Sequence, residues 1–179
     1  TAGFVWPAND KMARATALAE VHYMDRFLAH VPRRGIVVQA GGNAGVYPAH
    51  LATYFREVHT FEPDPTNYAC LVENVKKCQG AIAAHHAALG ERDGTCGVRQ
   101  IDPGNAGAVI VTEGGDIPIR QIDTFCLREC DLIWLDVEGY ELNALKGAEK
   151  TIETFWPAVI VEDNSLCEKH GIPRGAATE

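Results

Sequence analysis

The 179-residue sequence has no apolar run that approaches the ~20 residues needed to cross a bilayer, which argues against a membrane-spanning segment. It also has no surplus of basic residues, because 16 Lys and Arg stand against 24 Asp and Glu and give a formal net charge of −8. Such a balance does not suit a protein that binds nucleic acid through a broad basic surface. We therefore expect neither a membrane nor a nucleic acid as a partner.

The sequence has no Cys-x-x-Cys pair, and its six cysteines are scattered along the chain. Zinc fingers need closely spaced ligands, so no structural zinc site is expected. With 46% hydrophobic and 22% charged residues, the composition is that of a globular domain, which at this length does not need disulfides. We expect a single domain over residues 1–179, a cytoplasmic location, and reduced thiols at Cys70, Cys78, Cys96, Cys126, Cys130 and Cys167.

Residues 1–34 are interpreted as a helical lead-in to a core at residues 35–179. Residues 11–30 carry apolar side chains at steps of three and four, the spacing of an amphipathic helix that packs on a core. Trp6-Pro7 ahead of this helix is either a lid over a ligand or a hydrophobic staple, and the staple is favoured. The apolar face predicted for the helix consists of Met12, Ala15, Leu18, Ala19, His22, Tyr23, Phe27 and Leu28.

The central feature of the core is an apolar run, Ile36 to Ala40, that breaks into the glycines Gly41, Gly42 and Gly45 and then resumes. This pattern predicts a buried strand, a tight loop and a helix. Glycine permits positive φ and close approach to a ligand, although such a turn also serves simply to pack a helix on a strand. A dinucleotide loop would have the spacing Gly-x-Gly-x-x-Gly, and a Walker loop would continue into Gly-Lys-Ser/Thr. The spacing found here favours a ligand without a pyrophosphate.

A second apolar run, Val58 to Phe61, ends in Glu62, about 20 residues after the glycine loop. A carboxylate at this place can accept two hydrogen bonds from the diol of a ribose. If the two runs are neighbouring strands, one nucleoside-shaped ligand can contact both strand ends. The glycine loop and Glu62 together favour a nucleotide site.

Three further apolar runs, at residues 81–85, 131–135 and 158–161, alternate with predicted helices. This alternation predicts an α/β fold with a parallel sheet and helices on both faces. Ligands in such folds bind beyond the carboxyl ends of the strands. Between residues 91 and 121, repeated glycines predict only short extended segments and loops, which we expect to be mobile.

Three ordered motifs carry a resemblance to a known family. They are residues 37–45 (VVQAGGNAG), residues 59–65 (HTFEPDP), and residues 131–148, which contain Asp-x-Glu-Gly-x-Glu followed by Leu-x-x-Leu-x-Gly-Ala. Over residues 34–163 the sequence resembles the FkbM-type S-adenosylmethionine-dependent methyltransferases. The resemblance implies a Rossmann-like methyltransferase fold. The sequence starts at Thr1 and stops soon after the fifth strand, so we expect a chain that is trimmed or processed, and either an incomplete sequence or a shortened fold without the last strands.

By this resemblance the glycine loop holds the methionine part of S-adenosylmethionine, and Glu62 binds the ribose hydroxyls. The turn at His86-Ala87 flanks adenine, and Asp136 lies near the reacting methyl. Gln39 departs from the family, which usually has an acid there, so an amide replaces a charge-assisted hydrogen bond that is often worth about 1.5 to 3 kcal/mol. The implied cofactor-binding residues are Gln39, Gly41, Gly42, Asn43, Gly45, Glu62, Pro63, His86, Ala87 and Asp136.

Catalysis of methyl transfer mainly requires alignment of the reactants and exclusion of water, because a sulfonium methyl is already activated. A base is needed only where the acceptor carries a proton of high pKa, and the candidates are Asp136, Glu138 and Glu162. Each of these acids can instead cap a helix or form an ion pair. Asp136 with Asp163 and Asn164 is also similar to the Mg²⁺ triad of catechol-type O-methyltransferases, although the FkbM pattern requires no metal.

Two absent motifs narrow the methyl acceptor. The sequence has no Asn/Asp-Pro-Pro-aromatic motif for the amino groups of bases and no Pro-Cys nucleophile for ring carbons. Together with the acidic balance, this favours a small-molecule or carbohydrate hydroxyl. A Mg²⁺-dependent catechol-like O-methyltransferase, an NAD-binding oxidoreductase and a non-catalytic nucleotide-binding module remain alternatives. The oligomeric state, including a homodimer, stays open.

Overall fold

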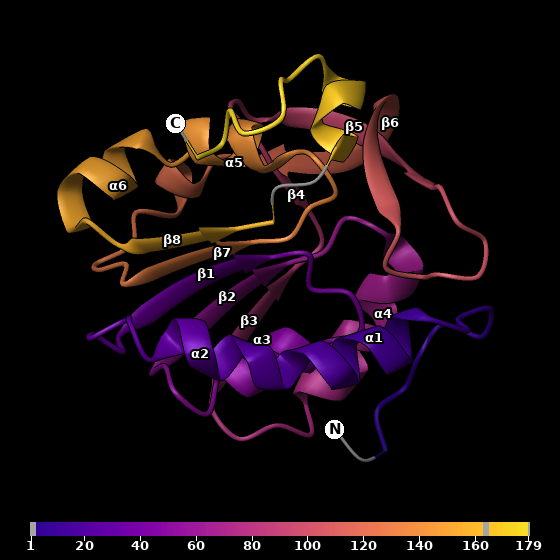
Figure 1. The fold of residues 1–179 in the computed structure, drawn as a ribbon, viewed down its shortest axis with the longest axis horizontal. Coiled ribbons are helices and arrows are strands. Elements are labelled where there is room, and N and C mark those ends of the chain that lie inside the picture. The colour runs from indigo at the N-terminus through magenta and orange to yellow at the C-terminus, as the bar shows by residue number, and fades with distance from the viewer. Residues whose placement is uncertain (1–2, 163–164, 179) are drawn as a thin grey trace.

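The computed structural model describes residues 3–162 and 165–178. Its larger sheet is built from the five apolar runs predicted as strands, and all neighbouring strands are parallel. Helices cover both faces of this sheet (Figure 1), so the predicted Rossmann-like α/β fold is confirmed. The strands follow the order β3 (Ala81–His85), β2 (Glu57–Phe61), β1 (Ile36–Ala40), β7 (Leu132–Leu135) and β8 (Ala158–Val161).

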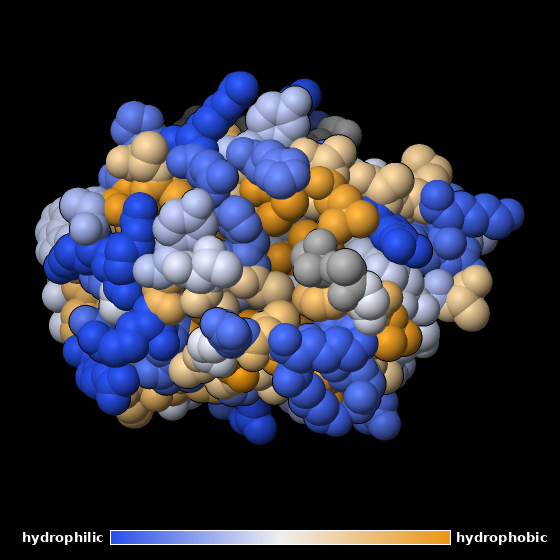
Figure 2. Space-filling model, turned by 90° about the horizontal axis from the view of Figure 1, so that it is seen from below, coloured by the Kyte–Doolittle hydropathy of each residue, from blue (hydrophilic) through white to orange (hydrophobic). Residues whose placement is uncertain are grey.

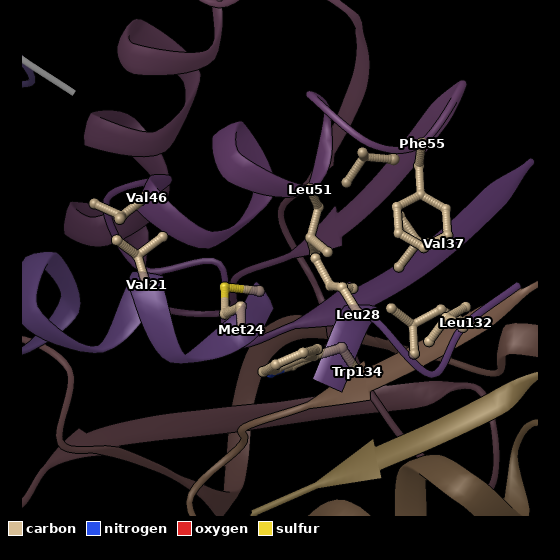
Figure 3. Packing of buried hydrophobic residues seen from close by; sticks show 11 residues of the cluster. Val21, Met24, Leu28, Val37, Val46, Leu51, Phe55, Leu132 and Trp134 are labelled. Atoms are coloured by element: carbon tan, nitrogen blue, oxygen red, sulfur yellow. The ribbon is translucent and has the colours of Figure 1, made fainter. Parts of the chain in front are cut away.

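Successive residues of the central strands are buried on opposite faces of the sheet, which explains why these strands have continuous apolar sequences. Val37 and Trp134 belong to the core of one face, which Figure 3 shows with the side chains of the lead-in helices packed towards them. Val38 and Leu135 belong to the core of the other face.

The first face is covered by α1 (Ala13–Glu20), η1 (Val21–Tyr23), α2 (Met24–Leu28), α3 (Val46–Leu51) and α4 (Pro65–Val75). The second face is covered by η2 (Ile122–Phe125), α5 (Glu141–Lys146) and α6 (Glu149–Phe155). A short helix, η3 (Ser165–His170), packs against the turn at Gly139. None of the helices in the described residues has the length and apolar character needed to cross a membrane. All six cysteines are free thiols, as predicted.

The lead-in is helical, but most of its predicted apolar face is exposed. Leu28 of that face is buried and Leu18 packs against the core, whereas Tyr23 is 55% exposed. The other residues that turn inward are Ala13, Val21 and Met24. Both sets of residues recur at helical spacing, so the sequence pattern alone does not decide which set turns inward. Figure 2 views this helical side of the molecule, where apolar patches interrupt a mainly hydrophilic surface.

Residues 91–121 contain extended segments, as predicted, but these are longer than expected and pair into a second sheet. This segment forms the antiparallel pair β5 (Gly94–Gln100) and β6 (Val109–Arg120), and β6 also pairs with β4 (Ala88–Leu89). The register shifts between Cys96 and Gly97, and a Cβ on Gly115 would lie 2.5 Å from the Cys96 carbonyl oxygen. The glycines here allow two strands to approach closely at a bulge.

The strand order fixes where a ligand can enter. The chain passes from β1 to β2 and β3 on one side, and then returns to β7 and β8 on the other side of β1. The loops that follow β1 and β7 therefore lead away in opposite directions, which opens a crevice at the carboxyl edge of the sheet.

Candidate active site

A cavity of about 280 Å³ lies at this carboxyl edge. Its walls come from the loops after β1, β2, β7 and β8, the turn before β4, the helix α1 and the strand β6. Among the residues predicted from sequence, those that line it are Gly41, Gly42, Asn43, Glu62, Pro63, Ala87, Asp136, Glu138 and Glu162. The structure therefore brings most of the predicted site into one space.

The glycine loop is held against the ends of two strands. The amides of Gly41 and Gly42 both donate to the Phe61 carbonyl, at 3.1 and 2.9 Å, and this ties the loop to the end of β2. Gly41 has a φ of +83°, and a Cβ on it would lie 1.9 Å from the carbonyl oxygen of Asp136. Glycine is required here so that the loop after β1 can touch the tip of β7.

Glu62 is buried, and both of its carboxylate oxygens accept main-chain hydrogen bonds. The Asn43 amide donates to Oε2 at 2.6 Å, and the Asp64 amide donates to Oε1 at 2.8 Å. Burial raises the pKa of Glu62 to about 7, against the opposing effect of these two hydrogen bonds. Asn43 has a φ of +44°, and its Oδ1 is buried without a hydrogen-bond partner among the described residues. This end of the cavity thus combines a carboxylate held in place by two main-chain hydrogen bonds with a side-chain oxygen that can accept a hydrogen bond from a ligand.

The opposite end of the cavity gathers acids. Asp136 and Glu162 follow the paired residues Leu135 and Val161 at the tips of β7 and β8. Burial raises the pKa of Asp136 well above its ordinary range, and the nearby carboxyl groups of Glu162 and Glu138 raise it further. Asp136 therefore favours its neutral, protonated form.

Most of one wall of the cavity was missed by the sequence reasoning. Thr16, Glu20 and Tyr47 line it from α1 and α3, beside Trp6, for which a place over a ligand was the less favoured of two interpretations. The Tyr47 hydroxyl donates to Oε2 of Glu20 at 2.9 Å, and burial followed by this bond raises the pKa of Tyr47. No local motif marks these residues, since only the docking of α1 on the sheet brings them together.

Trp6 is placed at this wall by a buried asparagine of α4. The Val5 amide donates to Oδ1 of Asn74 at 2.7 Å, and Nδ2 of Asn74 donates to the carbonyls of Val5 and Ala44, at 2.7 and 2.8 Å. Trp6 both packs against the core and lines the cavity. The favoured interpretation as a staple for the first helix therefore gives way to a role at the cavity wall.

Residues 39–173 match the family described as the methyltransferase FkbM domain. This chain belongs to that family. A curated relative, Methyltransferase 1 from Beauveria bassiana (strain ARSEF 2860), is 21% identical over 175 residues, which cover 80% of this chain and 69% of the relative.

A solved structure shows the same fold as this FkbM domain. A precorrin-8w decarboxylase from Methanobacterium thermoautotrophicum superposes with a TM-score of 0.51 and 16% identity, over 85% of this chain and 66% of that chain. This chain therefore spans about two thirds of the length of that protein. A putative RNA methyltransferase from Pyrococcus horikoshii gives a TM-score of 0.36 and 20% identity, over 46% of this chain and 44% of that chain.

Three predicted cofactor residues of the FkbM domain do not line the cavity. Gln39 is fully buried in the sheet, where its Nε2 donates to the carbonyls of Ala40 and Gly41, at 2.9 and 3.0 Å, and its Oε1 accepts from the Thr60 hydroxyl. Gly45 begins α3, and His86 stacks on a tyrosine of α4 with 4.7 Å between ring centroids. Gln39 thus braces the glycine loop from within the sheet.

The predicted Mg²⁺ triad cannot be located, because Asp163 and Asn164 lie outside the described residues. Within residues 3–162 and 165–178, no group of three or more His, Cys, Asp or Glu side chains could hold a metal ion. The Mg²⁺ requirement stays a prediction. Addition of EDTA tests it, since unchanged turnover in EDTA would remove the idea.

Proposed function

We propose that this FkbM domain binds S-adenosylmethionine and methylates a hydroxyl group of a small molecule or carbohydrate. The observation that carries the proposal is the meeting of the glycine loop with Glu62, through the 2.6 Å bond from the Asn43 amide, at one end of a cavity whose other end gathers carboxyl groups. One end suits an adenosine, and the other suits a positively charged reactive group.

The residues at the Glu62 end fit the nucleoside part of the cofactor. Each oxygen of Glu62 accepts one main-chain hydrogen bond, and the Asn67 side chain also hydrogen-bonds to this carboxyl group. A carboxylate has about four acceptor positions, so Glu62 can still accept from a ribose hydroxyl. Oδ1 of Asn43 offers another acceptor, since it is buried without a partner among the described residues. Pro63 and Ala87 line the adjoining wall, where small or apolar side chains leave room for adenine.

The charge of the cavity favours this cofactor over NAD. Among the described lining residues there are the carboxyl groups of Glu20, Glu62, Asp136, Glu138 and Glu162, and there is no Lys, Arg or His. S-adenosylmethionine supplies a methyl group activated on a positively charged sulfonium. The diphosphate of NAD would instead bring negative charge into an acidic space, so the oxidoreductase alternative is disfavoured.

The acid end supplies the groups needed to handle the acceptor's proton. Asp136 and Glu162 can accept the hydroxyl proton, and Glu138 is the other predicted candidate. Trp6 and α1 supply part of the cavity wall and so limit the space open to water. Because negative charge on the acceptor would be repelled by the same carboxyl groups, a neutral hydroxyl compound fits better than a phosphate or a carboxylate.

The proposal is tested by calorimetric titration of the protein with S-adenosylmethionine, S-adenosylhomocysteine and NAD, combined with mass spectrometry of any copurified ligand. We expect both adenosyl compounds to bind and NAD to bind more weakly. Tighter binding of NAD would overturn the assignment. Cofactor binding without turnover across a panel of hydroxyl acceptors would favour the non-catalytic module.

A further inference from the structure

The cavity has one wall that the proposed cofactor contacts do not use. Its polar and aromatic side chains are Trp6, Thr16, Glu20 and Tyr47, which come from the lead-in and from α3. The helices α1 and α3 pack side by side at this wall (Figure 1). A methyl acceptor has to reach the methyl group from the side opposite the sulfur, so it needs a part of the cavity that the cofactor leaves open. The wall formed by α1 and α3 offers such a part.

The Tyr47 side chain is held in this wall by its packing. Tyr47 is the second residue of α3, and its ring lies edge-on to that of Trp134, with 6.3 Å between the ring centroids. Its hydroxyl donates to Oε2 of Glu20 at 2.9 Å. The charges of Asp136 and Glu162 both act on this hydroxyl, which places it near the tips of β7 and β8 as well as beside α1.

Tyr47 and Glu20 together can accept hydrogen bonds from a ligand but have none to donate. A phenol has a single hydroxyl hydrogen, and that of Tyr47 points to Glu20, so the phenol oxygen can only accept. A carboxylate has about four acceptor positions and no donor, and the bond from Tyr47 occupies one of them. A ligand group that binds here therefore has to carry an O–H or N–H. An ether oxygen would face two acceptors with no hydrogen between them, which is unfavourable.

We propose that Tyr47 and Glu20 hold a second hydroxyl group of the acceptor, next to the hydroxyl that is methylated. The inference rests on the proposed function and narrows its substrate class to ring compounds with two neighbouring hydroxyl groups. Trp6 adds an aromatic side chain to the same wall, where it can pack on the apolar face of such a ring. Tyr47 and Glu20 are positioning residues, because they select which hydroxyl faces the methyl group. Once one hydroxyl has become a methoxy group, the product no longer fits for a second methylation.

The test uses three probes that differ in one substituent of a six-membered ring: trans-1,2-cyclohexanediol, trans-2-methoxycyclohexanol and cyclohexanol. Methyl transfer from S-adenosylmethionine is followed by mass spectrometry, and binding of each probe in the presence of S-adenosylhomocysteine is followed by saturation-transfer NMR. The proteins are the wild type, Tyr47→Phe, Glu20→Gln and Tyr54→Phe. Tyr54 provides the matched control, because its hydroxyl donates to Asp25 at 2.9 Å in the same way but outside the cavity lining.

In the wild type and in Tyr54→Phe, kcat/KM for the diol should exceed that for each of the other two probes by at least about tenfold, which corresponds to about 1.4 kcal/mol. Tyr47→Phe should reduce this preference through a higher KM for the diol, while the affinity for S-adenosylmethionine stays the same. Glu20→Gln should accept the methoxy compound better than the wild type does, because an amide can donate to an ether oxygen. Glu20 is exposed, so Glu20→Gln tests the pair even if Tyr47→Phe does not fold.

Equal kcat/KM for the three probes in the wild type would overturn the inference, and so would a preference for the diol that both variants retain. Binding of S-adenosylmethionine without binding or methylation of the diol would also overturn it. All three results leave the cofactor assignment intact. Failure of the wild type to bind S-adenosylmethionine would instead overturn the proposed function, and this inference with it.

Discussion

Replacement of Glu62 by Gln should remove a dependence of stability on pH while weakening cofactor binding. Glu62 is 4% exposed, and both of its oxygens accept main-chain amides. Burial raises its pKa from an ordinary 4.5 to about 7. Gln has nearly the same shape as the protonated acid, but it never ionises.

The magnitude follows from the two pKa values. Between pH 4.5 and pH 7 the unfolded chain has lost the proton of Glu62 while the folded protein keeps it, so the free energy of unfolding falls as the pH rises. The stabilisation is complete below pH 4.5 and lost once the pH exceeds about 7. The difference between the two pKa values corresponds to ~3 kcal/mol of unfolding free energy.

The assay is urea unfolding of the ligand-free wild type, Glu62→Gln and the control Glu153→Gln at pH 5, 6, 7 and 8. Relative to that of the wild type, the free energy of unfolding of Glu62→Gln should rise by ~2–3 kcal/mol between pH 5 and pH 8. The same variant should bind S-adenosylmethionine about tenfold or more weakly, because the ribose hydroxyls lose a charged acceptor. Parallel pH profiles for the wild type and Glu62→Gln would refute the burial argument. Unchanged cofactor affinity would refute the assignment of Glu62.

Three further predictions concern other buried groups. In the wild type, the free energy of unfolding should fall by ~1–2 kcal/mol as the pH drops from 6.5 to 4, because burial and a neighbouring histidine lower the pKa of half-buried His85 to about 4. His85→Leu should abolish this fall, and urea unfolding at both pH values checks it. Asn74→Ala should lower the free energy of unfolding by ~2–4 kcal/mol, because the amide and carbonyl of Val5 and the carbonyl of Ala44 lose their hydrogen-bond partner. Tryptophan fluorescence should report the loosened N-terminal segment. Gly41→Ala should lower the free energy of unfolding by at least ~3 kcal/mol, because the new Cβ would overlap the Asp136 carbonyl and the residue has a positive φ. An unchanged melting temperature would contradict the contact between the glycine loop and the tip of β7.

The core strands and the cofactor end of the site were predictable because their signals are local. A strand buried on both faces needs a continuous apolar run, and a ligand at its carboxyl end needs a loop and a polar residue directly after that run. Gly41 and Glu62 meet this condition, and the structure joins their loops through the Asn43 amide. The rule that parallel strands end at one edge then places them together without any further information.

The other parts of the site could not be predicted from the sequence, because they depend on how separate helices and strands pack. Gln39 lies two residues before Gly41, near enough to the glycine loop for a ligand-binding residue, yet the packing of β1 against β2 turns its amide towards the Thr60 hydroxyl. The wall formed by Glu20 and Tyr47 exists only because α1 docks on the sheet beside α3. The pairing of Asp136 with Glu162 is set by the register of β7 and β8. Periodicity along a chain records which residues are apolar at a given spacing, but the rotation of a helix and the alignment of two strands are decided by contacts between distant segments.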